Sequence, residues 1–132
     1  MIYVHNLRVY YEDTDMAGIV YYANYLKFAE RGRSDAVRDM GIDQNEMKAA
    51  GLVFAVRSVQ ADYHKAARFG DELRVETVTG KVSGASLEMR QRILRVDDLV
   101  FSGNFKVACM DLSGKAARLP ADIRQKLLKS FG

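Results

Sequence analysis

The stretch of residues 10 to 25 reads YYEDTDMAGIVYYANY, and it contains the most informative pattern in the chain. It begins as an aromatic, extended run, passes through an acidic turn at residues 12 to 15, crosses Gly18 and enters a helical pattern at about Asn24. The first turn of a helix leaves backbone N–H groups without intrahelical partners. The pattern therefore predicts a place where carboxylates and free backbone donors meet.

Hydrolysis is the chemistry that such a place favours. Unpaired N–H groups and the helix macrodipole stabilise a developing oxyanion. A carboxylate a few residues upstream can act as a general base toward water, or can attack a carbonyl itself. Gly18 allows a positive φ or a close approach of substrate to the backbone. The alternative interpretation is a solvated acidic turn before an ordinary helix.

The same stretch resembles a family signature. Residues 13 to 25 are similar, without a gap, to the pattern Asp-x-Asp-x-x-Gly-x-Val-x-x-x-x-Tyr of the hotdog-fold acyl-CoA thioesterases of the 4-hydroxybenzoyl-CoA thioesterase and YbgC type. The resemblance continues through residues 28 to 33 and 66 to 73, and it covers nearly the whole chain. It implies a hotdog fold and hydrolysis of an acyl-CoA to a free acid and CoA.

The resemblance also implies roles for particular residues. Asp15 matches the catalytic carboxylate, which serves as general base or nucleophile, and Tyr22 matches the residue whose backbone N–H polarises the thioester carbonyl. Gly18, Val20 and Tyr25 of the same motif match the substrate site. Many relatives of the YbgC branch have His where this chain has Tyr22, whereas the aromatic-acyl branch often has Tyr. The oxyanion role uses the main chain and is independent of that difference.

Coenzyme A contacts and subunit assembly are further expectations. The phosphates of CoA are expected at the turn from Lys81 to Ser86, which includes Ser83, with help from Arg57 or Arg92 across a subunit boundary. The resemblance implies dimers that join sheet edges and often form tetramers, with each active site between subunits. It also implies that peripheral association with membranes is compatible with the family.

Composition limits the class of protein. The chain has 132 residues, enough for one domain over residues 1–132 with a sizeable core. With 48% hydrophobic and 28% charged residues it is expected to be globular rather than disordered. The formal charge of +3 suits an anionic ligand but is too small to indicate nucleic acid.

The chain gives few signs of export or membrane insertion. Its single cysteine, Cys109, excludes an intrachain disulfide, fits a reducing compartment and is expected to be a small buried hydrophobe. The N-terminus lacks the layout of a signal peptide, and no apolar run is long enough to span a bilayer. We therefore expect a cytoplasmic protein without a transmembrane segment.

The secondary structure follows from hydrophobic periodicity. Alternation over residues 2 to 11 predicts a half-buried strand that places Tyr11 on its inner side. Helical spacing predicts a helix from Asn24 to Met40, ended by Gly41 at C′. Gly32 costs about 1 kcal/mol against Ala in a helix, which predicts close contact with a sheet. Charged side chains are expected on the opposite side of this helix: Arg31, Arg33, Asp35, Arg38 and Asp39.

Alternation and β-branched residues predict four more strands. These are Leu52 to Lys65, Glu72 to Lys81, Ser86 to Val96 and Leu99 to Met110. The hairpin turns expected between them are Gly70-Asp71, Ser83-Gly84 and Asp97-Asp98. Residues 43 to 50 are expected to form a short helical or irregular connector, and Pro120 suits the N1 position of a final helix from Ala121 to Lys129. The order predicts an α+β hotdog: a curled, antiparallel five-stranded sheet around one long helix.

Other side chains are secondary candidates. Glu30 is a second possible catalytic acid on the central helix, and the alternative for it is a structural ion pair with a nearby arginine. His5 is expected to be structural or at the surface, and His64 to be at the surface. There is no phosphate-binding glycine loop, no metal-type Cys or His spacing and no nucleophile elbow, so neither a metal nor a cofactor is expected.

Four functions agree with these patterns to different degrees. An acyl-CoA thioesterase is the leading hypothesis, and an acyl-carrier-protein thioesterase stays open because the basic charge suits an acidic carrier as well as CoA. A non-catalytic acyl-CoA-binding or scaffolding module has no need of the intact Asp15. A hotdog dehydratase is least favoured, because it depends on a catalytic histidine and only His64 lies in the body of the fold.

Overall fold

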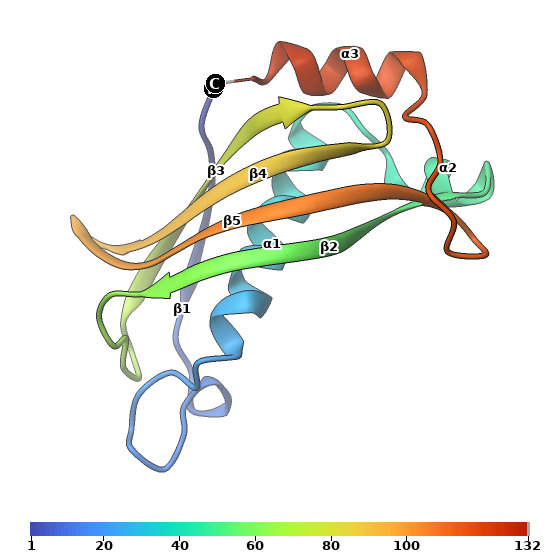
Figure 1. The fold of residues 1–132 in the computed structure, drawn as a ribbon. Coiled ribbons are helices and arrows are strands. Elements are labelled where there is room, and N and C mark those ends of the chain that lie inside the picture. Colours follow the sequence, from blue (N-terminus) through green and yellow to red (C-terminus); the bar gives the residue numbers. More distant parts are fainter. Residues whose placement is uncertain (132) are drawn as a thin grey trace.

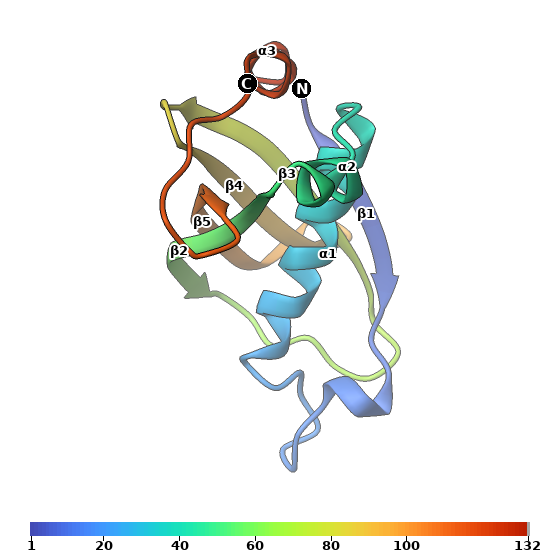
Figure 2. The same cartoon turned by 90° about the vertical axis from the view of Figure 1, so that its right-hand side faces the viewer.

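The computed structural model describes residues 1 to 131, which form one antiparallel sheet of five strands and three α-helices (Figure 1). The elements are β1 (Tyr3–Arg8), the 3₁₀ helix η1 (Tyr11–Asp13), α1 (Asn24–Asp39), α2 (Gln44–Ala49), β2 (Leu52–Tyr63), β3 (Glu72–Val82), β4 (Ser86–Arg95), β5 (Asp98–Asp111) and α3 (Ala121–Lys129). The strand order is β1-β3-β4-β5-β2. Figure 2 shows α1 along one face of the curled sheet and α3 across one end. The predicted α+β architecture is confirmed.

The first strand is shorter than predicted. It ends at Arg8, and Tyr11 begins η1 with its side chain largely exposed rather than on the inner side of a strand. The carboxylate of Asp13 accepts a hydrogen bond from the Tyr10 N–H at 2.9 Å. Local bonds of this kind from an acidic side chain compete with a strand ladder, so the acidic turn ends the strand early. The exposed Tyr11 ring stacks on Phe69, with 4.3 Å between centroids.

The predicted hairpin at Gly70-Asp71 is wrong. The strands on either side of it, β2 and β3, are not neighbours, because β2 pairs with β5 and β3 lies between β1 and β4. The connecting segment instead crosses beneath the start of α1, where Ile19 and Arg68 form a β-bridge and the Val9 N–H donates to Asp71. The other two predicted turns do join paired strands, β3 to β4 and β4 to β5.

The final helix begins as predicted at Ala121, but Pro120 occupies the N-cap rather than N1. Its φ of −57° suits the proline ring, while its ψ of 146° is extended, so Pro120 lies outside the helix. The Arg124 N–H donates to the Pro120 carbonyl at 2.9 Å. Two buried residues then fix α3 on the sheet, since Leu127 is fully buried and the Ser130 hydroxyl donates to Thr79 at 2.8 Å.

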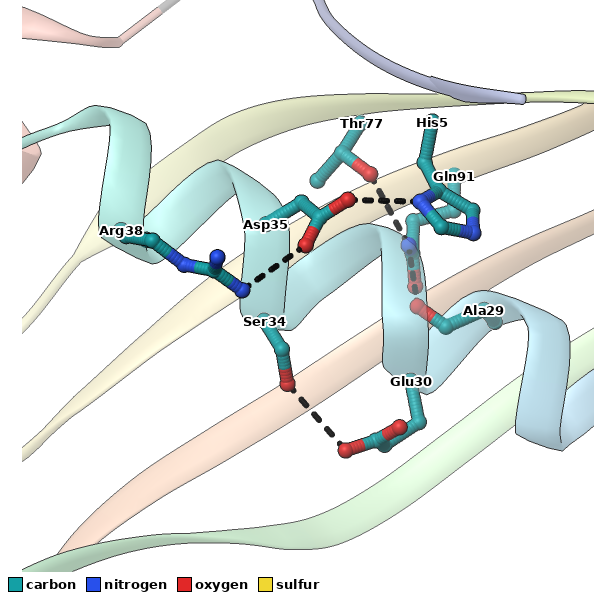
Figure 3. Close-up of polar contacts among 8 residues, drawn as sticks. All are labelled: His5, Ala29, Glu30, Ser34, Asp35, Arg38, Thr77 and Gln91. Atoms are coloured by element: carbon teal, nitrogen blue, oxygen red, sulfur yellow. Dashed lines mark hydrogen bonds and ion pairs between the residues drawn. The ribbon is translucent and has the colours of Figure 1, made fainter. Parts of the chain in front are cut away.

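Helix α1 approaches the sheet most closely at Gly32. A Cβ there would lie 2.6 Å from Cγ1 of Val75, which confirms the predicted close contact. Gln91 of β4 is buried beside it and donates to the carbonyl of Ala29 at 2.8 Å and to the Thr77 hydroxyl at 2.9 Å (Figure 3). The side chain of Gln91 therefore binds the backbone of α1, and this bond fixes the distance between the helix and the sheet.

The other side of α1 is tied to β1. Nδ1 of His5 lies 2.6 Å from the Asp35 carboxylate, which also accepts from Arg38 at 3.1 Å (Figure 3). His5 is thus structural, as expected. Asp35 is half-buried in this contact and does not face open solvent as predicted, because its helical position faces the neighbouring strand.

Helix α1 covers the β1 side of the sheet more than the β2 side. The main contacts of α1 are with β1, β3 and β4. Strand β2 is an edge strand of 12 residues, and it leaves Val56, Val59 and Tyr63 at least 41% exposed. A long edge strand with exposed apolar side chains is a ready template for pairing with another chain.

Candidate active site

The loop between β1 and α1 projects from one end of the molecule, at the bottom of Figure 1. It is closed by hydrogen bonds from the Asp15 N–H to the Ile19 carbonyl at 3.0 Å and from the Gly18 N–H to the Asp15 carbonyl at 2.9 Å. Gly18 has a φ of +77°, a conformation that side chains disfavour. The positive φ expected from the sequence is confirmed, and it allows the tight turn that presents Asp15.

The two motif aspartates have different surroundings. Asp13 is a structural residue: its carboxylate caps the Tyr10 N–H, and its carbonyl accepts from the Tyr21 N–H and the Asn24 side chain, each at 2.9 Å. Asp15 is exposed, and one carboxylate oxygen accepts from the Ala17 N–H at 2.9 Å. Among residues 1 to 131 nothing bonds to its second oxygen. Asp15 therefore presents a free acceptor atom.

The start of α1 presents free donors. Ala23 is the N-cap and has no side chain that can cap the helix, while the Asn24 N–H donates to the Tyr21 carbonyl at 2.8 Å. In the described part of the chain, neither the Tyr22 N–H nor the Ala23 N–H has a hydrogen-bond acceptor. These two amides and the macrodipole make a place where negative charge is stabilised.

Two residues that the motif assigns to the substrate site, Val20 and Tyr25, are buried in the core beneath the loop. Tyr25 is buried, its hydroxyl accepts from the Ala67 N–H at 3.0 Å, and its ring is parallel to Phe101 at 5.5 Å. Burial raises the pKa of Tyr25. Val20 is also buried, and its N–H donates to the Ala67 carbonyl at 2.8 Å. Both hold the loop and the helix start together, and their contact with substrate stays a prediction.

Asp71 stabilises the segment between β2 and β3, which contains Ala67, the partner of both Val20 and Tyr25. Its carboxylate accepts from the Arg68 N–H and from the Arg95 guanidinium, each at 2.8 Å, and Arg95 also donates to the Ala66 carbonyl at 3.0 Å. Burial acts to raise the pKa of Asp71, but the Arg68 N–H and the Arg95 guanidinium outweigh it and hold that pKa below its usual value. Folding therefore favours the ionised form.

Replacing Asp71 by Asn is expected to lower the free energy of unfolding at pH 7 by about 1 to 3 kcal/mol, the cost of leaving a charged partner poorly paired. A depressed pKa stabilises the fold above the unfolded-state value near 3.9, and this stabilisation is lost as pH falls through the lower folded-state value. The difference from wild type should therefore shrink below about pH 4. Urea unfolding at pH 7 and in acid tests this, with Asp97→Asn in the exposed β4–β5 turn as control. An equal loss at both pH values would contradict it.

Glu30 does not form the predicted ion pair with arginine. It is exposed and accepts a hydrogen bond from the Ser34 hydroxyl one turn later, at 3.1 Å (Figure 3). Arg33, predicted on the solvent side, is half-buried: its guanidinium lies 4.3 Å from the centre of the Phe105 ring and donates to Gln91 at 3.0 Å. Both residues line a pocket of about 170 Å³ between α1, α2 and the β2 side of the sheet.

The residues expected to bind CoA lie far from Asp15 within one chain. Ser83 lies in the β3–β4 turn beside α3, with Lys81 at the end of β3 and Ser86 at the start of β4, at the opposite end from the loop between β1 and α1 (Figure 1). The Ser83 N–H donates to the Ser86 carbonyl at 2.7 Å, and Arg124 of α3 donates to the Ser83 carbonyl. The β3–β4 turn can therefore lie next to the loop that contains Asp15 only if the turn and the loop come from different chains.

The two arginines that were expected to help bind CoA, Arg57 and Arg92, lie on different strands, β2 and β4. Arg57 is exposed at the register shift of the edge strand β2. Arg92 is exposed on β4 and donates to Glu76 at 2.7 Å. His64 is exposed and lies 2.8 Å from the Ser102 hydroxyl, so it agrees with the predicted surface position. Cys109 is fully buried, as predicted, and burial raises its pKa.

The fold and the site together define a class of protein. A curled antiparallel sheet around one long helix is a hotdog fold. The loop that leads into the helix contains a free carboxylate oxygen and unpaired amides, the two kinds of group that hydrolysis of a carbonyl compound uses. No helix among residues 1 to 131 is long and apolar enough to cross a membrane.

Family membership follows from sequence. The family model of the Thioesterase-like superfamily matches residues 9 to 127, so the chain belongs to this family. It is 38% identical over 120 residues to the acyl-CoA thioesterase YbgC of Haemophilus influenzae, covering 89% of this chain and 88% of that protein. It is 37% identical over 119 residues to the acyl-CoA thioester hydrolase YbgC of Escherichia coli, with 89% of each chain covered. The resemblance stated from the motif is confirmed.

Solved structures agree. A probable thioesterase from Bartonella henselae superposes with a TM-score of 0.86 at 34% identity and covers 91% of this chain and 100% of its own. The 1,4-dihydroxy-2-naphthoyl-CoA thioesterase Slr0204 from Synechocystis has a TM-score of 0.88 at 20% identity, covers 97% and 96% of the two chains, and shows the shared fold alone.

Proposed function

We propose that this chain hydrolyses an acyl-CoA thioester to a free acid and CoA, with Asp15 as the catalytic carboxylate and the Tyr22 N–H as the oxyanion donor. One observation carries the proposal: a single loop has a free carboxylate oxygen on Asp15 and leads to the unpaired Tyr22 and Ala23 amides just before α1. Membership of the family and identity to acyl-CoA thioesterases agree with it.

The reaction then follows from these two groups. As general base, Asp15 removes a proton from water, and the hydroxide attacks the thioester carbonyl. The carbonyl oxygen becomes an oxyanion at the Tyr22 N–H, the C–S bond breaks, and the thiolate of CoA takes the proton back from Asp15. As nucleophile, the Asp15 carboxylate attacks the carbonyl carbon, the C–S bond breaks, and the thiolate of CoA leaves an acyl anhydride on Asp15. Water then opens the anhydride to the free acid and protonated Asp15, which gives its proton to the thiolate. Water is the second substrate in both routes, and no cofactor or metal is needed.

The enzyme is proposed to work as a homo-oligomer in which two β2 edges pair. The exposed apolar side chains of β2 and its open backbone groups provide the surface. Such a dimer joins the two sheets into one continuous sheet with no open β2 edge, and two dimers can form the homotetramer. Sedimentation measures the assembly, and a monomer that hydrolyses acyl-CoA at full rate would contradict this part of the proposal.

The CoA phosphates are proposed to bind near Lys81, supplied by a neighbouring subunit. Lys81→Ala should raise KM for acyl-CoA several-fold at low salt, where contacts between exposed charges are least screened, and should change kcat little. Lys115→Ala, in an exposed turn after β5, is the control. An unchanged KM at low salt would remove Lys81 from the site.

A thiol-release assay of the purified protein tests the function as a whole. The substrates are short-chain, long-chain and aromatic acyl-CoAs, together with an acyl group on acyl carrier protein. Turnover of any acyl-CoA above the Asp15→Asn background supports the proposal. Turnover restricted to the carrier protein identifies the alternative thioesterase, and tight acyl-CoA binding without turnover identifies a scaffolding module.

We place the enzyme in the cytoplasm, where acyl-CoA is made and where a single reduced cysteine fits. Peripheral association with the membrane is compatible with this location. Cell fractionation with and without high salt distinguishes the free from the associated form, and recovery outside the cytoplasm would contradict the proposal.

A further inference from the structure

The pocket beside α1 has the size and the lining of a site for the far end of an acyl chain. Its floor is apolar and comes from the sheet, with Phe54, Leu87, Met89 and Val107 among its lining residues. Its volume is about 170 Å³, and a protein cavity of about 150 Å³ holds a benzene molecule. A fragment of about six non-hydrogen atoms therefore fits.

Arg33 is the unusual member of this lining. Its guanidinium is half-buried over the Phe105 ring and is held by one hydrogen bond to the Gln91 side chain. Within residues 1 to 131 no carboxylate lies within ion-pair distance of it. Burial lowers the pKa of Arg33, although Glu30 acts in the opposite direction. A half-buried cation is stabilised by an anion, so the pocket favours a negatively charged occupant.

Gln91 fixes the direction of this guanidinium. Its amide nitrogen is bonded to Ala29 and Thr77, as Figure 3 shows, so its oxygen is turned toward Arg33. A guanidinium has five N–H donors, and this bond uses one of them. The remaining donors can bind a carboxylate through two parallel hydrogen bonds, a geometry that a hydroxyl cannot match.

One stripe of α1 joins this pocket to the proposed oxyanion donors. The pocket-lining residues Glu30, Arg33 and Val37 recur at helical spacing, and the same spacing leads back through Leu26 to Ala23 at the helix start. From Tyr22 to Arg33 the helix rises about 16 Å. An extended alkyl chain with C–C bonds of about 1.5 Å advances about 1.3 Å per carbon, so about 12 carbons span this distance.

We propose that Arg33 is a specificity-determining residue that binds a carboxylate at the far end of the acyl chain, so that the preferred substrate is the CoA monothioester of a medium-chain dicarboxylic acid. The inference rests on the proposed function for the position of the thioester. The chain lies along the stripe from Ala23 to Arg33, and its free carboxylate reaches the guanidinium. Glu30 stays at the exposed mouth of the pocket, bonded to Ser34, where water screens its repulsion.

The test compares three CoA thioesters of equal length: dodecanedioyl, ω-hydroxydodecanoyl and dodecanoyl. Wild type should show a higher kcat/KM for the dicarboxylic substrate than for the other two. Arg33→Met, which keeps an unbranched apolar stem but removes the guanidinium, should lower the ratio of dicarboxylic to plain substrate by a factor of about 10 to 100, as expected for a lost charge-assisted interaction. Arg31→Met, on the exposed side of the same helix, should leave the ratio unchanged.

Three outcomes would overturn the inference: equal ratios in wild type and Arg33→Met, preference of wild type for the plain chain, or equal preference for the ω-hydroxy and dicarboxylic chains. If Arg33→Met fails to fold, Arg33→Lys should keep a preference for the dicarboxylic chain, and its loss would count against the inference.

Calorimetry with free dodecanedioic and dodecanoic acids separates this inference from the proposed function. Tighter binding of the diacid to wild type, absent in Arg33→Met, supports the Arg33 site even where no acyl-CoA is hydrolysed. Turnover of dodecanoyl-CoA without discrimination between the two free acids supports the proposed function and overturns the Arg33 site.

Discussion

Replacing Asp15 by Asn is expected to lower kcat by a factor of at least about 100, the lower range of a general-base contribution. The substitution keeps the size of the side chain and its acceptor oxygen for the Ala17 N–H, so the turn should stay intact. The amide cannot take a proton from water and cannot form an acyl anhydride. Steady-state thiol release measures the loss, and circular dichroism and sedimentation check folding and assembly.

Asp13→Asn is the matched control, two residues away in the same loop. Its side-chain oxygen can still cap the Tyr10 N–H, and its backbone carbonyl keeps the bonds to Tyr21 and Asn24. Activity should therefore fall much less than in Asp15→Asn. Similar losses in the two variants, or a loss in Asp13→Asn alone, would mean that the motif has been assigned in the wrong register.

The sequence predicts those parts of the site that local chemistry determines. The start of α1 at Asn24, the positive φ of Gly18 and the close approach at Gly32 depend on short-range preferences of the backbone, and all three are confirmed. The early end of β1 depends on short-range bonds too, but alternation hides it. A carboxylate that caps a backbone N–H three residues back competes with the strand, and Asp13 does this.

Hydrophobic periodicity does not predict which strands pair with each other in the sheet. Strand β2 alternates like the others, and nothing within it indicates that β5 rather than β3 is its neighbour. Gly70 and Asp71 look like a hairpin turn, and Gly70 does have a φ of +85°. The difference lies in Arg68, Arg95 and the motif loop, which hold the segment beneath α1. Those contacts come from residues distant in the sequence.

Arg33 shows the same limit on the helix. By spacing it belongs with the charged side chains opposite the core, and an arginine is seldom placed inside from composition alone. Its burial depends on Phe105 and Gln91, on strands far along the chain. A guanidinium tolerates this position because it can stack on an aromatic face while keeping donors free. The candidate specificity site is therefore visible only in three dimensions.

Tyr22 gives the sharpest separation of a main-chain role from a side-chain role. If its N–H meets the thioester oxygen, Tyr22→Phe keeps the donor and should change kcat by less than about tenfold, roughly 1.4 kcal/mol. The Tyr22 ring is 62% exposed and touches Tyr63 edge-on with 6.1 Å between centroids, so losing the hydroxyl should leave this ring contact intact. A large loss in this variant would indicate the phenol hydroxyl as donor or acid.

Tyr22→Pro removes the N–H and should lower kcat by about 100-fold or more, the effect of losing one oxyanion donor. In the described chain this N–H has no intramolecular partner, so proline breaks no hydrogen bond of the fold there. Proline is also tolerated close to a helix start. Circular dichroism must show that α1 is retained. A folded Tyr22→Pro enzyme with near-normal turnover would exclude the Tyr22 amide as the oxyanion donor.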